Sequence, residues 1–134
     1  MKKYKNNPYI IRHNRRYIRA GESKPDHGIC TFVSEYYGIY AAVKILFYSF
    51  RSFGFVSIHD IVKHFTPISF AQKDFYLQQI CKFLNTGPYY VLESSDDYAR
   101  LMVRLSQLND YPVILEQVNQ VFDDLKIEKA LAAS

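Results

Sequence analysis

The sequence predicts a single α-rich domain of the α+β type, in which about five helices follow a short N-terminal strand or hairpin segment. Apolar residues recur at helical spacing over much of residues 34–128, and several of these stretches begin with residues typical of helix N-caps. The 134 residues contain no internal repeat and no low-complexity linker. Because this length is typical of one domain, we expect residues 1–134 to form one unit.

Residues 1–31, called the N-terminal segment below, hold few periodic apolar positions. We expect an extended or hairpin-like course, with short strands at residues 9–12 and 29–32 and a turn at Asp26-His27-Gly28.

The core helices are predicted within residues 34–87. The first begins at the N-cap Ser34 and ends at Gly54, and it is apolar nearly all round, as expected of a central helix. The next two begin with capping boxes at residues 57–60 and 69–72, and they end at Thr66-Pro67 and at residues 85–88.

A C-terminal helical extension is predicted over residues 95–128. Its first helix opens at residues 95–97 and ends at Asn109-Asp110. Its second begins at Tyr111 and places Ile114, Val118, Val121, Phe122 and Leu125 at helical spacing.

Positive charge is concentrated at the beginning of the chain. Residues 1–24 contain eight Lys or Arg and one acidic residue, Glu22. Such a segment favours a polyanionic partner, nucleic acid included, although a solvated terminus explains the same charges.

The two cysteines, Cys30 and Cys81, have no metal-ligand or redox spacing. A buried free thiol is expected at Cys81. The sequence does not decide whether Cys30 and Cys81 form a disulfide. Residues 36–50 are very apolar but include Lys44 and are too short to span a bilayer, so no membrane insertion is expected. The first residues lack the apolar core of a signal peptide, and we expect a soluble protein made in the cytoplasm.

Four short motifs follow one another along the chain in an order that is typical of a known protein family. They are Asn6-Asn7-Pro8 with Ile11 and Arg12, the stretch from Phe32 to Ala42 (FVSEYYGIYAA), Val56-Ser57-Ile58 and Phe65-Thr66-Pro67. From Asn6 to about Gly87, this chain resembles the small lysozyme-like virion structural proteins of phages and prophages. The resemblance implies a lysozyme-like fold, and virion association with it.

The chain departs from that family's pattern at polar and Trp positions. Tyr40 replaces the usual Arg, Tyr17 is the nearest candidate for a Trp, and Phe70-Ala71-Gln72-Lys73 replaces an acidic run. A glycosidase needs a carboxylic acid that protonates the glycosidic oxygen, and no acidic residue precedes Asn6. The resemblance therefore implies the scaffold of a degenerate member without its catalyst.

The candidate catalytic residues are Glu22 and Glu35, although Glu35 is explained more simply as a first-turn helix acid. The candidate ligand-binding residues are Asn6, Asn7, Arg12 and Tyr17. His59 and His64 do not share a helix face and have no third ligand nearby, so neither a metal site nor a cofactor is expected.

Three functions remain open from the sequence. The leading expectation is a non-catalytic phage-derived domain that binds peptidoglycan-like glycan, or a phage or host protein, with the glycan held between the basic N-terminal segment and the first long helix. The second is an active glycan hydrolase or lytic transglycosylase using Glu22 or Glu35. The third is a nucleic-acid-binding module driven by residues 1–24. The oligomeric state does not follow from the sequence.

Overall fold

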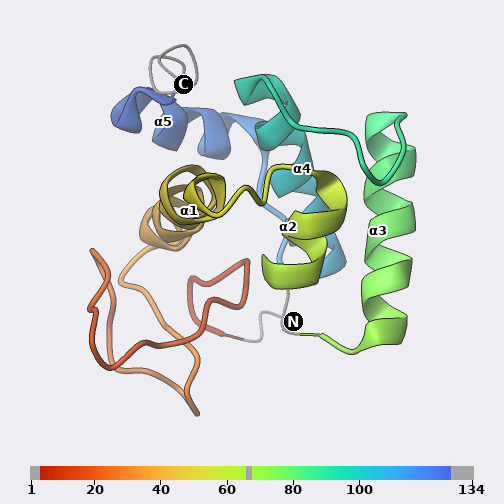
Figure 1. Cartoon of the computed structure of the whole chain (residues 1–134). Helices are drawn as coiled ribbons and strands as arrows, with labels where there is room; N and C mark the ends of the chain where they lie inside the picture. The colour runs from red at the N-terminus through yellow and green to blue at the C-terminus, as the bar shows by residue number, and fades with distance from the viewer. Residues whose placement is uncertain (1–3, 66–67, 128–134) are drawn as a thin grey trace.

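Helix α1 (Glu35–Lys44) lies between the N-terminal segment and the last helix of the chain in the computed structural model, which describes residues 4–65 and 68–127 (Figure 1). Ser34 is its N-cap as predicted, although the Ser34 hydroxyl makes no capping hydrogen bond. Gly38, Ile39, Ala41, Ala42 and Val43 are buried, which agrees with the central position expected from its apolar surface.

The helix changes its winding after Lys44. Residues Ile45–Phe50 form a π-helical segment, η1, where the sequence predicted a single α-helix as far as Gly54. Gly54 has a left-handed backbone with φ of +79°, so the predicted glycine stop is confirmed.

The next helices begin where their capping residues predict. Helix α2 (Ile58–Phe65) starts after Ser57, whose hydroxyl accepts a hydrogen bond from Asp60 N at 3.1 Å. Helix α3 (Phe70–Leu84) has the complete capping box of Ser69 and Gln72 and ends at Asn85 in the left-handed region. The predicted stop at Thr66-Pro67 lies outside the described residues.

The last two helices are α4 (Ser95–Leu108), capped by Ser94, and α5 (Leu115–Leu125). The predicted start of the last helix at Tyr111 is wrong. Pro112 disfavours helical backbone at the residue before it, and Asp110 has a φ of +60°. The chain turns helical only after the N-cap Ile114.

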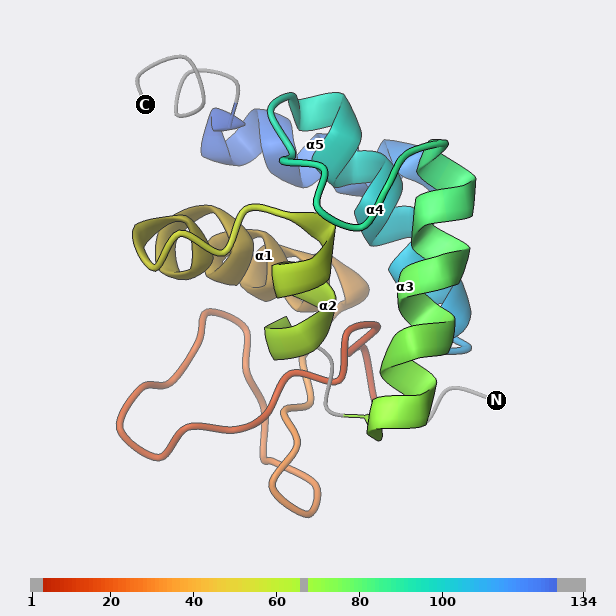
Figure 2. The same cartoon turned by 45° about the vertical axis from the view of Figure 1, so that its right-hand side comes forward.

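The predicted N-terminal strands are also wrong. Within the described part of the N-terminal segment, pairing is limited to isolated antiparallel bridges, such as Arg12 with Ile29. Left-handed backbone interrupts the first predicted strand at Ile10, with a φ of +55°, and lies just before the second at His27, with a φ of +50°. The segment instead forms irregular loops beneath α1 and α2, which both views show (Figures 1 and 2).

One hydrophobic cluster joins the N-terminal segment to the helices. The Tyr9 hydroxyl donates to Met102 O at 3.1 Å and so ties the segment to α4. Phe47 of η1 contacts Tyr98 of α4, with ring centroids 4.3 Å apart. Among the described helices, none has the length and apolar character that crossing a bilayer requires.

Candidate ligand-binding groove

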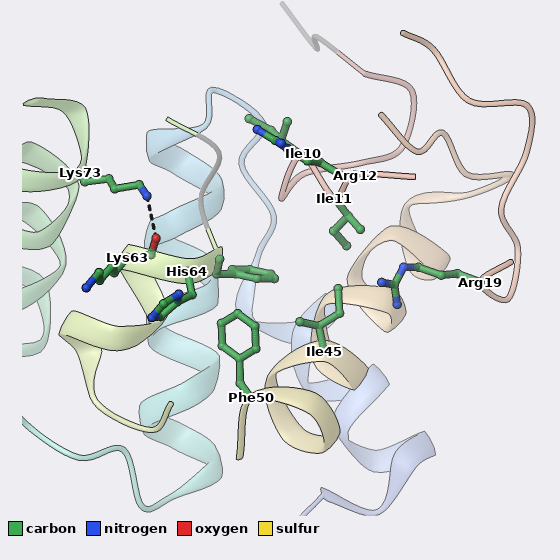
Figure 3. A pocket seen from close by; sticks show the side chains of 10 residues that line it. Ile10, Ile11, Arg12, Arg19, Ile45, Phe50, Lys63, His64 and Lys73 are labelled. Atoms are coloured by element: carbon green, nitrogen blue, oxygen red, sulfur yellow. Dashed lines mark hydrogen bonds between the residues drawn. The ribbon is translucent and has the colours of Figure 1, made fainter. Parts of the chain in front are cut away.

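Three adjoining hollows lie between the N-terminal segment and the stretch formed by α1 and η1. Arg19 lines all three, and we call them together the Arg19 groove. The main hollow, of about 400 Å³, reaches on to α2 and α3 (Figure 3). Its lining residues are Ile10, Ile11, Arg12, Arg19, Ile45, Phe50, Lys63, His64, Phe65 and Lys73.

The lining of the groove is basic. Lys63, His64 and Lys73 stand on one side of the main hollow and Arg19 on the other, with Phe50 and Ile45 between them (Figure 3). Lys73 Nζ is held in place by a 2.7 Å hydrogen bond to Lys63 O. None of the residues that line the three hollows is Asp or Glu. The groove therefore favours an anionic ligand.

Arg19, which belongs to this basic lining, has one nitrogen that could donate a hydrogen bond but has no acceptor in the part of the chain that the structure describes. Its Nε is buried and has no hydrogen-bond partner among the described residues. Its guanidinium carbon lies 5.4 Å from the centre of the Tyr17 ring. Because Arg19 Nε is itself enclosed, the contribution of Arg19 to anion binding comes from the positive charge of its guanidinium.

Tyrosines line the narrower part of the groove. Tyr17 and Tyr48 are about half exposed, at 52% and 49% of their surface. Lys44 Nζ lies 5.7 Å from the Tyr40 ring centre and 5.6 Å from that of Tyr48. Exposed aromatic faces beside cations can pack on the flat faces of sugar rings or bases while the cations hold acidic groups.

The apolar floor depends on the π-helical winding of η1. Ile45 and Phe50 are the first and last residues of this segment and both line the main hollow. Residues five positions apart lie over one another in a π-helix, whereas they diverge in an α-helix. Ile10, opposite them, keeps a left-handed backbone that is unfavourable for a β-branched residue.

Two of the predicted ligand-binding residues lie in the groove. Arg12 lines the main hollow, and Tyr17 lines the two narrower ones. Sequence reasoning missed Arg19, Lys63 and Lys73 as site residues. Only Lys44 gave a local signal, since it is the single charge in the apolar run of residues 36–50.

Asn6 and Asn7 instead hold the backbone of the N-terminal segment. Asn7 is buried, its Nδ2 donates to Ile11 O and Cys30 O at 3.1 and 2.9 Å, and its Oδ1 accepts from Ile11 N at 3.0 Å. Asn6 Nδ2 donates to Phe32 O at 2.8 Å. These contacts support the wall of the groove from behind.

The two candidate catalytic carboxylates are engaged elsewhere. Glu35 accepts hydrogen bonds from Tyr111 Oη at 3.1 Å and Gln117 Nε2 at 3.0 Å, joining α1 to α5. Burial first, and then the Glu35 carboxylate, raise the pKa of Tyr111 to about 12. Neither Glu35 nor Glu22 is among the residues that line the Arg19 groove.

Glu22 lies inside the N-terminal segment, with only 1% of its side chain exposed. It contacts His13 Nδ1 through Oε2 at 2.5 Å and accepts from Arg19 N through Oε1 at 3.0 Å. Burial, followed by the charge of Glu22, raises the pKa of the nearby Cys30 thiol to about 11. Cys30 and Cys81 are both free thiols, so no disulfide joins them. Cys30 is buried, whereas Cys81, for which the sequence predicts a buried thiol, is only partly buried.

No protein-family model matches this chain, and no curated protein matches it either.

Proposed function

We propose that this chain is a non-catalytic, lysozyme-like binding module that holds an anionic glycan chain of the peptidoglycan type in the Arg19 groove. The observation that carries the proposal is a groove lined by cations and tyrosines without a carboxylate. Its position between the N-terminal segment and α1 agrees with the glycan site expected from the sequence.

The lining favours binding over cleavage. Glycoside hydrolysis requires a carboxylic acid at the scissile bond, and most glycosidases use a pair of carboxyl groups. Glu22 is enclosed by His13 and the Arg19 backbone, and Glu35 is occupied by Tyr111 and Gln117. Peptidoglycan strands carry free carboxylates on their peptide stems, which Arg12, Arg19 and Lys73 are suited to bind.

Sedimentation with purified peptidoglycan sacculi tests this proposal, with soluble muropeptides measured in the same tube. Lys73→Gln removes a partly exposed cation of the main hollow and is expected to weaken sedimentation about threefold to tenfold, since such a charge contributes about 1 kcal/mol. Lys82→Gln is a matched control, because Lys82 is a lysine of the same helix outside the groove.

Each outcome has a definite meaning. Sedimentation that weakens in Lys73→Gln and not in Lys82→Gln, without muropeptide release, supports the proposal. Release that is lost in Glu22→Gln or Glu35→Gln identifies an active hydrolase or lytic transglycosylase instead. Neither binding nor release excludes glycan as the ligand and leaves a phage or host protein as the partner.

Nucleic acid is the second candidate ligand. Arg15 and Arg16 are exposed beside the groove and extend its positive charge along the N-terminal segment. A single-stranded oligonucleotide would place phosphates on the cations and bases on the tyrosines. This function predicts that affinity for DNA falls steeply between low and physiological salt and falls further in Arg15→Gln.

A further inference from the structure

A cluster of three metal-ligating side chains lies inside the N-terminal segment, outside the lining of the Arg19 groove. The ligand atoms of His13, Glu22 and Cys30 all lie within 4.8 Å of one another. Cys30 is fully buried, and the side chains of Glu22 and His13 are 1% and 18% exposed. The small opening at His13 gives the cluster a route to solvent.

Backbone hydrogen bonds fix the positions from which these side chains project. His13 N donates to Gly28 O and Cys30 N donates to Ile11 O, both at 2.9 Å. Glu22 Oε1 accepts from Arg19 N at 3.0 Å, which leaves Oε2 directed at His13. The cluster is therefore pre-assembled in a segment that has neither helix nor regular strand among its described residues.

The three groups match the ligand preferences of one metal ion. Imidazole, carboxylate and thiolate together favour Zn²⁺, and three protein ligands with one water complete its tetrahedral coordination. We propose that His13, Glu22 and Cys30 form a zinc site that staples the N-terminal segment. This inference is independent of the glycan-binding function.

Metal binding requires a small movement of the ligand side chains, and the charges of the ligands balance the charge of the ion. Zinc–ligand bonds of about 2.0–2.3 Å place neighbouring ligand atoms roughly 3.3–3.8 Å apart, so the 2.5 Å contact of His13 with Glu22 opens by about 1 Å. The Cys30 thiol releases its proton to the solvent, and so does the contact between His13 Nδ1 and Glu22 Oε2, while His13 Nε2 keeps or takes up a proton so that the imidazole binds as a neutral ligand. The thiolate and the carboxylate then neutralise the two charges of the ion, so the nearby Arg19 guanidinium faces a neutral site.

Cobalt(II) is the direct probe, because it occupies zinc sites and reports its ligands by absorption. The chelator-treated full chain is titrated with Co²⁺. We expect one equivalent to produce a thiolate-to-cobalt charge-transfer band together with the intense visible bands of tetrahedral cobalt, both removed by Zn²⁺. His13→Ala is expected to weaken cobalt binding at least ~10-fold. Zinc is expected to raise the unfolding temperature of the unmodified chain.

Cys81→Ser keeps the test decisive even where Cys30→Ser does not fold. The chain has two cysteines, so a charge-transfer band that survives in Cys81→Ser assigns the thiolate to Cys30. The proposal is overturned by a folded chain that gives no such band at millimolar cobalt. A band that disappears in Cys81→Ser also overturns it, because the thiolate would then belong to Cys81. So does a band that His13→Ala leaves unchanged and that is no stronger than the band of the urea-unfolded chain.

Discussion

A Cβ atom placed on Gly38 would lie 1.9 Å from the carbonyl oxygen of Asn6. The turn at Asn6-Asn7-Pro8 packs directly on the backbone of α1 at this point, and Pro8 Cδ would lie 3.0 Å from the same Cβ. The two sequence elements that suggested a lysozyme-like family are therefore in contact. The close approach of the two backbones explains why position 38 is a glycine.

Gly38→Ala is expected to lower the free energy of unfolding by about 3 kcal/mol, because the added methyl group forces the Asn6 turn away from α1. Urea unfolding followed by circular dichroism measures the loss. Gly87→Ala is the control: a Cβ added there would meet no atom within 4 Å, and we expect a change below about 0.5 kcal/mol. Equal losses in both variants would contradict the assigned contact.

Asn7→Ala is expected to lower the free energy of unfolding by about 2–3 kcal/mol, since it leaves Cys30 O and the backbone of Ile11 without their buried partner. The same unfolding measurement tests it. Asn14→Ala removes a single exposed hydrogen bond to Arg16 N and should lose less than about 1 kcal/mol. A loss in Asn7→Ala no larger than that in Asn14→Ala would contradict the role assigned to Asn7.

Tyr111 is expected to make the fold sensitive to alkali. Its pKa is raised to about 12 from 10.0, so its contribution to stability is complete below pH 10 and is lost as the pH rises towards 12. The loss attributable to this one group is at most about 1.4 kcal/mol per pH unit.

Urea unfolding at pH 9, 10 and 11 measures this dependence. Tyr111→Phe removes the ionising group and should reduce the slope above pH 10. The remaining slope is expected to come from Cys30 and the other tyrosines whose pKa values are also raised, which are Tyr9, Tyr36, Tyr76, Tyr90 and Tyr98. Tyr89→Phe, at a side chain that is 72% exposed, is the matched control for the substitution itself. A slope that is the same in Tyr111→Phe as in the unmodified chain would refute the assignment.

Tyr48→Ala is expected to weaken sacculus binding about fivefold, because it removes an exposed aromatic face beside Lys44 that is worth roughly 1 kcal/mol. Sedimentation at several sacculus concentrations gives the ratio of affinities. Tyr89→Ala serves as the comparison, as Tyr89 is exposed and does not line the groove. Equal weakening in the two variants would place the glycan elsewhere.

The sequence predicts the helices best where a boundary depends on local chemistry. The caps at Ser57 and Ser69 and the stop at Gly54 involve residues within one turn of each other, so the pattern is sufficient. The predicted start of the last helix at Tyr111 is wrong because Pro112 disfavours helical backbone at Tyr111. This local effect outweighs the apolar periodicity. The predicted strands do not form because the Asn7 side chain hydrogen-bonds to the backbone N and O of Ile11, which pairing between two strands would need.

The candidate site is harder to predict because its parts come from distant segments. The sequence places Arg12 and Tyr17 at a groove beside the first helix, and both line it. Lys63 and Lys73 reach the main hollow only because α2 and α3 fold against the N-terminal segment. Similarly, His13 and Cys30 meet through loop geometry that no spacing rule describes.

The floor of the main hollow stands on η1, whose π-helical winding holds a single extra residue per turn. Removing one codon within residues 45–50 would restore ordinary α-helical winding while keeping a continuous helix. Phe50 would then stand four residues after Ile45, a spacing that keeps both side chains on one face of an α-helix, so the apolar floor would stay in the hollow. The π-helical winding thus accommodates one extra residue in this stretch without turning Phe50 away from Ile45.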